Sequence, residues 1–66
     1  MKDIIEHFGS KSALAEALDV ERSAVSLWLR HGLPPHRAIE IERLTAGKFK
    51  ALDIVGAKGD FNDGDN

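Results

Sequence analysis

Apolar residues recur at helical spacing on both sides of a short break at residues 19–21. Before the break, Leu14, Ala15 and Leu18 lie three and four residues apart, which places them on one face of a helix. After the break, the spacing resumes with Val20, Ala24, Val25 and Trp28. So short a break allows only a sharp turn between two crossing helices. The pattern therefore predicts a helix-turn-helix over residues 11–30, a motif whose second helix can lie in the major groove of DNA.

Capping and turn residues set the expected limits of these two helices. Ser10 is the predicted N-cap of the first, because its hydroxyl can accept one of the first backbone N–H groups. That helix is expected to run to residue 18, and Asp19 in the turn is expected to adopt left-handed backbone geometry. The second helix is predicted over residues 22–31, with Gly32 after its end.

Two further helices flank the motif. Residues 2–8 form the first of them, with Gly9 as its left-handed end. The other begins at Pro35, which suits the first turn of a helix because no N–H donor is missed there. It ends at Gly47, and its inward row consists of Ala38, Ile41 and Thr45.

The segment after Lys48 has no unique interpretation from spacing. Phe49, Leu52 and Val55 would share one face of a helix, but the alternation over residues 49–54 also fits a short strand. Residues 56–66 hold three glycines and three acids, so they are expected to form a flexible tail. The predicted division is a helix-turn-helix domain at residues 1–55 and a tail at residues 56–66.

Composition limits the class of protein. The chain has 66 residues and no cysteine, so one small core without disulfides or thiolate metal sites is expected. The hydrophobic share of 42% argues against wholesale disorder. There is no apolar run of about 18 residues, as a membrane span would need, and no basic-then-apolar leader, so a cytoplasmic location is expected.

The formal net charge of −2 is unevenly distributed. Three aspartates lie in the last seven residues, so residues 1–58 carry nine Lys or Arg against eight Asp or Glu, or about +1. A DNA-binding face needs a local excess of positive charge rather than a basic chain. The distribution is therefore compatible with a nucleic-acid partner, at modest and salt-dependent affinity per subunit.

The outward face of residues 22–31 carries the candidate base contacts. They are Arg22, Ser23, Ser26 and Leu27. Arg22 can donate a bidentate pair to guanine, and the two serines can reach a base edge or a phosphate. Leu27 has two open interpretations, an apolar contact with a thymine methyl or a core position against Leu33.

Candidate phosphate contacts surround this face. They are Ser10, Lys11, Arg30, His36 and Arg37. The alternative for Arg22 and Arg30 is that they are ordinary solvated charges. The three histidines fall at different helix ends without cysteine partners, so neither a metal site nor a catalytic cluster is predicted. No cofactor, small-molecule substrate or enzymatic activity is expected.

A resemblance to a known family covers about two thirds of the chain. The segments HFGSKSALAEALDVERSAVSLW and LPPHRAIEIERLTAG, within residues 7–47, resemble the Cro repressors of lambdoid phages and the related YdaS-type prophage domain. The chain departs from the family pattern at Asp19, where glycine is usual, and at Leu27, where a polar residue often reads the base.

The resemblance implies a transcriptional repressor that binds operator DNA of two half-sites as a weak homodimer, with base readers at Arg22, Ser23, Ser26 and Leu27. The C-terminal halves of such proteins are either helical or sheet-forming, and residues 35–47 favour the helical branch. The expected fold is therefore all-α, a compact bundle of four to five helices with a helix-turn-helix and a flexible acidic tail.

A second function class stays open. An antitoxin-like protein-interaction module with weak DNA binding could use an apolar face formed by Phe49, Leu52, Ile54 and Val55. The acidic tail is expected to be a solvated end, and a hypothesis beside this is that it covers the basic face and lowers non-specific DNA affinity.

Overall fold

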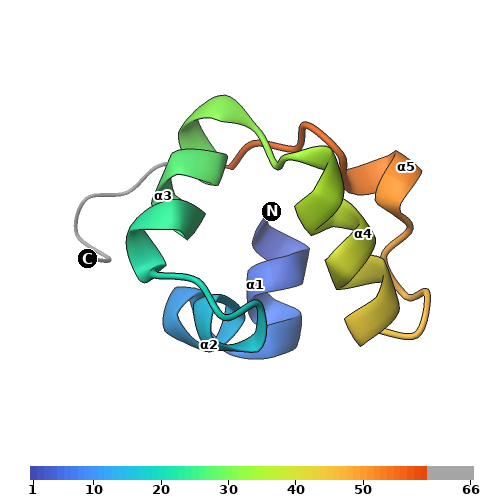
Figure 1. Ribbon diagram of the computed structural model, residues 1–66, viewed down its shortest axis with the longest axis horizontal. Coiled ribbons are helices and arrows are strands. Elements are labelled where there is room, and N and C mark those ends of the chain that lie inside the picture. Colours follow the sequence, from blue (N-terminus) through green and yellow to red (C-terminus); the bar gives the residue numbers. More distant parts are fainter. Residues whose placement is uncertain (60–66) are drawn as a thin grey trace.

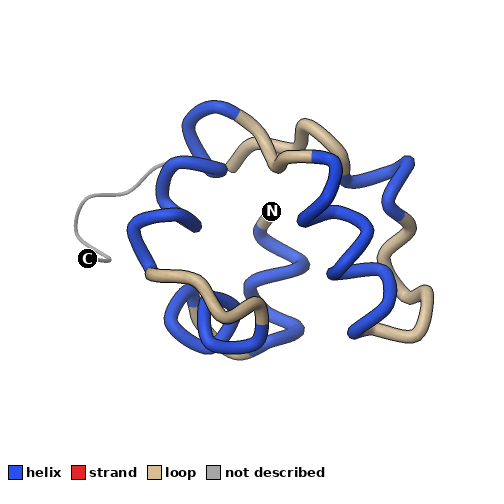
Figure 2. Tube along the Cα trace, in the orientation of Figure 1, coloured by secondary structure: helices blue, strands red, loops and turns tan. Residues whose placement is uncertain are grey.

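The computed structural model describes residues 1–59. Within them the chain forms five helices and no strand (Figures 1 and 2). The helices are α1 (Lys2–Phe8), α2 (Lys11–Ala17), α3 (Arg22–His31), α4 (Pro35–Leu44) and α5 (Ala51–Ile54). The all-α prediction is confirmed. Residues 60–66 of the tail expected at residues 56–66 lie outside the described residues.

The predicted capping and turn residues occupy their expected places. The Ser10 hydroxyl accepts a hydrogen bond from the backbone N–H of Ala13 at 3.0 Å, which caps α2. Gly9 and Gly32, after α1 and α3, both have a φ of 111°. Asp19 has a φ of 58°, the left-handed geometry that the short turn required.

The three N-terminal helices form one packed unit, with α2 in contact with both α1 and α3. The turn is closed by a hydrogen bond from the N–H of Val20 to the carbonyl of Ala15 at 2.9 Å. Leu14 on α2 and Val25 on α3 belong to one core cluster and are fully buried, and Trp28 is buried in the same cluster. Phe8 is only partly buried against this cluster.

The segment after Lys48 is helical, which settles the open choice between helix and strand. The Glu42 carboxylate on α4 accepts a hydrogen bond from the N–H of Ala51 at 2.7 Å, and α5 packs against α4. Ile54 is 8% exposed and belongs to the core. The proposed apolar face is wrong in this respect, because α5 turns Ile54 inward while Leu52 and Val55 remain at the surface.

Residues 56–59, assigned from the sequence to the tail, make backbone hydrogen bonds to the body of the domain. Gly56 donates to the carbonyl of Leu33 at 2.8 Å, and Leu33 donates to the carbonyl of Ala57 at 3.0 Å. Gly59 donates to the carbonyl of Leu29 at 3.1 Å. The chain therefore returns from α5 to the end of α3.

No helix of the described chain is long and apolar enough to span a bilayer.

Candidate nucleic-acid interface

Helix α3 has one side that faces the core and one that faces the surface. Val25, Trp28 and Leu29 are buried on the inward side. On the other side Arg22, Ser23 and Arg30 are exposed, and Ser26 is partly exposed. Leu27 is 53% exposed, so of its two interpretations the surface position holds and the core position against Leu33 does not. All four predicted base-contact residues thus reach the surface of one helix.

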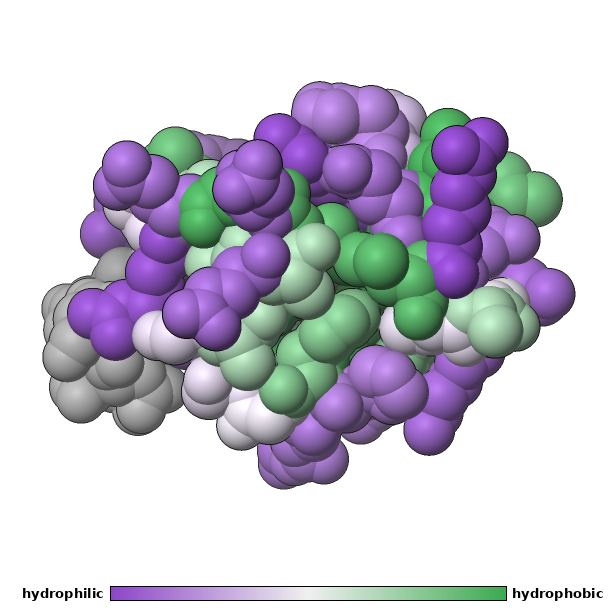
Figure 3. Space-filling view, turned by 60° about the horizontal axis from the view of Figure 1, so that its bottom comes forward, coloured by the Kyte–Doolittle hydropathy of each residue, from purple (hydrophilic) through white to green (hydrophobic). Residues whose placement is uncertain are grey.

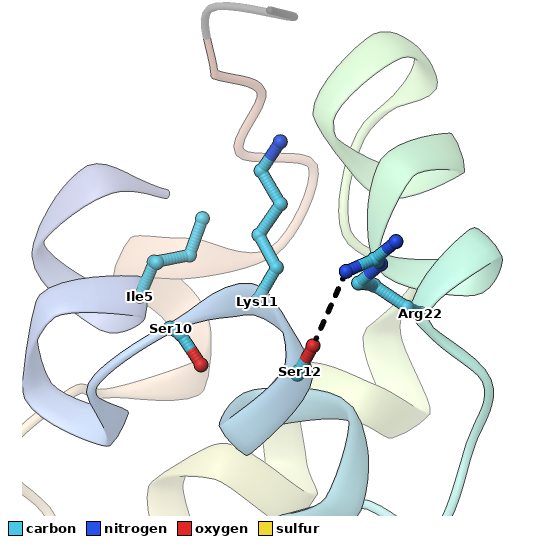
Figure 4. A pocket seen from close by; sticks show the side chains of 5 residues that line it. All are labelled: Ile5, Ser10, Lys11, Ser12 and Arg22. Carbon is cyan, nitrogen blue, oxygen red and sulfur yellow. Dashed lines mark hydrogen bonds between the residues drawn. The ribbon is translucent and has the colours of Figure 1, made fainter. Parts of the chain in front are cut away.

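The start of α2 lies beside the start of α3. A surface cavity of about 290 Å³ is lined by Ile5, Ser10, Lys11, Ser12 and Arg22. Arg22 extends from α3 toward this cavity, and its Nη1 donates a hydrogen bond to the Ser12 hydroxyl at 3.5 Å (Figure 4). The structure therefore brings together three of the predicted residues, Ser10, Lys11 and Arg22.

Ser12 is a member of this group that the sequence did not indicate. It is the second residue of α2, and its side chain is exposed. A serine near the start of a helix indicates an N-cap, and Ser10 fills that role. The sequence pattern therefore gives Ser12 no function of its own. Its contact with Arg22 depends on how α2 crosses α3, which residue spacing within either helix does not report.

The other predicted phosphate contacts lie where α3 ends and α4 begins. Arg30 and His36 are exposed. Arg37 is partly buried, and its guanidinium donates to the Glu40 carboxylate at 2.6 Å and to the carbonyl of Leu18 at 3.5 Å. Arg37 thus ties α4 to the end of α2. The i, i+3 spacing of Arg37 and Glu40 was the available signal for this ion pair.

Apolar residues are also exposed outside α3. Figure 3, which brings the side of α2 forward, shows apolar side chains gathered in the middle of a face with hydrophilic ones around them. The large apolar side chains at the surface beyond Leu27 are Ile39 and Leu44 on α4, Leu52 on α5, and Val55. Leu52 is the most exposed of these, at 91%.

The described residues offer no group of three or more His, Cys, Asp or Glu side chains that could hold a metal ion. The arrangement that remains is a helix-turn-helix whose exposed helix carries two arginines and two serines, with a lysine at the start of the preceding helix. These donors suit base edges and phosphate oxygens.

Comparison with known proteins agrees with this chemistry. The family model described as the DNA-binding transcriptional regulator Cro matches residues 1–60. The regulatory protein cro of Pseudomonas phage D3 is 41% identical over 58 residues, which cover 85% of this chain and 80% of that protein. The regulatory protein cro of Salmonella phage P22 is 43% identical over 49 residues, which cover 74% of this chain and 79% of that protein.

No solved structure matches the chain. The family match extends beyond the segments that suggested the resemblance, since it includes α1 and α5. The chain belongs to the Cro family of phage DNA-binding transcriptional regulators.

Proposed function

We propose that this regulator represses transcription by binding an operator of two half-sites, with α3 in the major groove of each. The observation that carries the proposal is the division of α3 into a buried apolar side and an exposed side with Arg22, Ser23 and Leu27. Recognition helices of this motif place their N-terminal residues deepest in the groove. Arg22 and Ser23 are the first two residues of α3.

Each exposed residue suits a particular contact. Arg22 can donate two hydrogen bonds to O6 and N7 of guanine, and Ser23 and Ser26 can reach base edges or phosphates. Leu27 has no polar atom in its side chain, so we assign it an apolar contact with a thymine methyl. Arg22 is then the residue of this set that can make a bidentate base contact.

Phosphate contacts would flank this centre. We assign one strand to Ser10 and Lys11 at the cavity beside Arg22, and the opposite strand to Arg30 and His36. Arg37 was also a candidate, but its guanidinium already donates to Glu40 and the carbonyl of Leu18. Because Arg37 is also partly buried whereas Arg30 is exposed, we expect Arg37 to contribute less to DNA affinity than Arg30.

A second copy of the chain would occupy the second half-site. Ile39 on α4, Leu52 on α5 and Val55 after α5 are exposed apolar side chains that could make such a contact, and we call them the α4–α5 surface. Three side chains form a small interface, which suits a weak dimer that assembles on DNA. The same surface could instead serve an unrelated protein partner, as an antitoxin-like module would require.

The test is selection of bound sites from random duplexes at two salt concentrations. Enrichment of an inverted repeat with half-sites about one helical turn apart would support the proposal. Binding without sequence preference that disappears at the higher salt would contradict it.

Arg22→Ala is the matching variant. It should weaken operator binding by about 1–3 kcal/mol and relax one base preference, because a bidentate guanine contact is lost. Arg43→Ala, which removes an exposed arginine of α4, is the control for charge alone. Equal effects of the two substitutions would remove Arg22 from the base contacts.

A further inference from the structure

We propose that the acidic segment formed by residues 60–66 occupies the exposed side of α3 when DNA is absent and competes with DNA phosphates for it. The inference rests on the part of the proposed function that places α3 against DNA. It adds a partner within the same chain to a surface so far assigned only to DNA. The carrying observation is the place where the described chain ends, which is hydrogen-bonded to α3.

A strap formed by residues 56–59 fixes the point from which the acidic segment starts. Two backbone hydrogen bonds hold the strap to Leu33, and Gly59 donates to the carbonyl of Leu29 at 3.1 Å. A Cβ added at Gly59 would lie 2.6 Å from Cδ2 of Leu29, so a larger residue there would displace the leucine side chain. The described chain therefore ends in close contact with the last turn of α3 (Figure 1).

The acidic segment and the exposed side of α3 carry opposite charges. Residues 60–66 contain Asp60, Asp63 and Asp65 and no lysine or arginine. Helix α3 contains Arg22 and Arg30, both exposed, and no aspartate or glutamate. An aspartate carboxylate offers a guanidinium the same kind of charged oxygen acceptor as a DNA phosphate does. The acidic segment therefore matches the charge that this side of α3 is suited to bind.

The acidic segment is long enough to cover this side. Its seven residues span up to about 23 Å when extended, whereas α3, with ten residues, is about 15 Å long. A chain that starts at the last turn of α3 can therefore reach Arg22 in the first turn. Because a short tether keeps a segment at an effective concentration of about millimolar, individually weak ion pairs are sufficient to hold it there.

DNA and the acidic segment cannot occupy the exposed side of α3 at the same time. Binding of any duplex then requires the fraction of molecules in which this side is open, so the affinity falls by the same factor for an operator and for unrelated DNA. Complexes with unrelated DNA depend on phosphate contacts and are weak. They are therefore the first to be lost at a given protein concentration.

Neutralisation of the acidic segment tests the competition in the full chain. Asp60→Asn, Asp63→Asn and Asp65→Asn are combined, and binding to the selected operator and to an unrelated duplex is measured at several salt concentrations. Both affinities should rise by about 3- to 10-fold at low salt, the range for a few exposed ion pairs. The gain should shrink at higher salt, because salt screens the ion pairs that close α3 in the parent.

The matched control removes the same number of acidic charges elsewhere. It combines Asp3→Asn, Glu6→Gln and Asp53→Asn, at exposed positions of α1 and α5, two helices whose backbones stay apart from that of α3. This variant should gain clearly less affinity for both duplexes. An equal gain in the two triple variants would mean that net charge alone is responsible, and it would overturn the inference.

A spin label measures the position of the acidic segment without reference to DNA selection. The chain has no cysteine, so Asn66→Cys can carry a nitroxide at one site and keeps all three aspartates. In the free protein at low salt, the label should broaden the amide signals of Ser23 and Ser26 more than those of α5, at the other end of the domain (Figure 1). This broadening should disappear when a duplex is added and in the triple asparagine variant.

The outcomes separate the two proposals. If the signals of α3 are not selectively broadened, or stay broadened with a duplex bound, the competition is wrong while the proposed function stands. If the parent binds all duplexes equally, the operator function is wrong. Loss of the label's effect on α3 when a duplex is added would support the inference even then.

Discussion

Two non-glycine residues of the described chain adopt left-handed backbone geometry, Asp19 with a φ of 58° and Ala46 with a φ of 53°. Aspartate tolerates this region because its short polar side chain can bond locally, whereas alanine has no such compensation. Ala46 follows the C-cap of α4, and Gly47 after it also has a positive φ, of 85°. The helix thus ends through two successive left-handed residues, of which only one is glycine.

Ala46→Gly is therefore expected to stabilise the protein. The left-handed region costs an L-residue about 1–2 kcal/mol, a cost that glycine avoids. Glycine in turn lowers the free energy of unfolding by about 0.4–1 kcal/mol, because it increases the conformational entropy of the unfolded chain. The net gain in the free energy of unfolding should be about 0.5–1 kcal/mol, measurable by urea denaturation. Ala17→Gly, at the exposed last residue of α2, is the control and should destabilise by up to about 1 kcal/mol. A loss of stability in Ala46→Gly would contradict the argument.

Helices with a longer periodic pattern of apolar residues were predicted better from the sequence than the short one. Helices α1 and α3 begin and end at the predicted residues because each has a clear apolar face and a glycine after its end. Helix α5 has four residues, too few for either periodicity or intrinsic propensity to specify it. Its position is set by two side chains that accept hydrogen bonds: the Glu42 carboxylate accepts from the N–H of Ala51, and the Thr45 hydroxyl accepts from the N–H of Phe49.

Glu42→Ala should consequently loosen α5. Loss of the acceptor for the N–H of Ala51 is expected to reduce the free energy of unfolding by about 1–2 kcal/mol. Hydrogen exchange of the Ala51 amide should accelerate, since this amide loses its partner. Glu42→Gln retains a carbonyl oxygen and should lose less. Equal losses in the two variants would mean that the charge of Glu42, rather than this hydrogen bond, holds α5.

Among the predicted DNA-contact residues, surface exposure followed from the sequence but contacts with other helices did not. The outward side of α3 followed from one helical period, because burial of Val25 and Trp28 fixes which residues face away. Arg22 and Arg37 also bond across helices, Arg22 to Ser12 on α2 and Arg37 to the carbonyl of Leu18 at the end of α2. Such contacts depend on how helices cross, and a pattern along one helix does not contain that information.

At the scale of the whole molecule, the most exposed large apolar side chain among residues 1–59 lies on the shortest helix of that part of the chain. Leu52 on α5 is held at the surface by the same geometry that buries Ile54. Exposed apolar residues occur singly on many proteins, but a nearly fully exposed leucine on a pinned helix suits an interface. We therefore predict that Leu52 contributes to assembly rather than to folding.

Leu52→Gln should weaken self-association and operator affinity, each by about tenfold or less, without lowering the free energy of unfolding. Sedimentation at several protein concentrations and DNA titration measure the two effects. Leu44→Gln is the control, because Leu44 lies five residues after Ile39 on α4 and so projects to a different side of that helix. Unchanged association in Leu52→Gln would exclude this surface from the dimer and favour a different partner.

The described chain also returns to its own beginning. The α-amino group of Met1 donates to the carbonyl of Lys58 at 3.4 Å, and Gly59 is hydrogen-bonded to Leu29 near the end of α3. Taken as connectivity, the five helices therefore form a nearly closed ring. A circular permutant that joins residue 59 to residue 1 and opens the loop at residues 45–50 is expected to keep every helix pair. Its folding would mean that the packing does not require this order of helices along the chain.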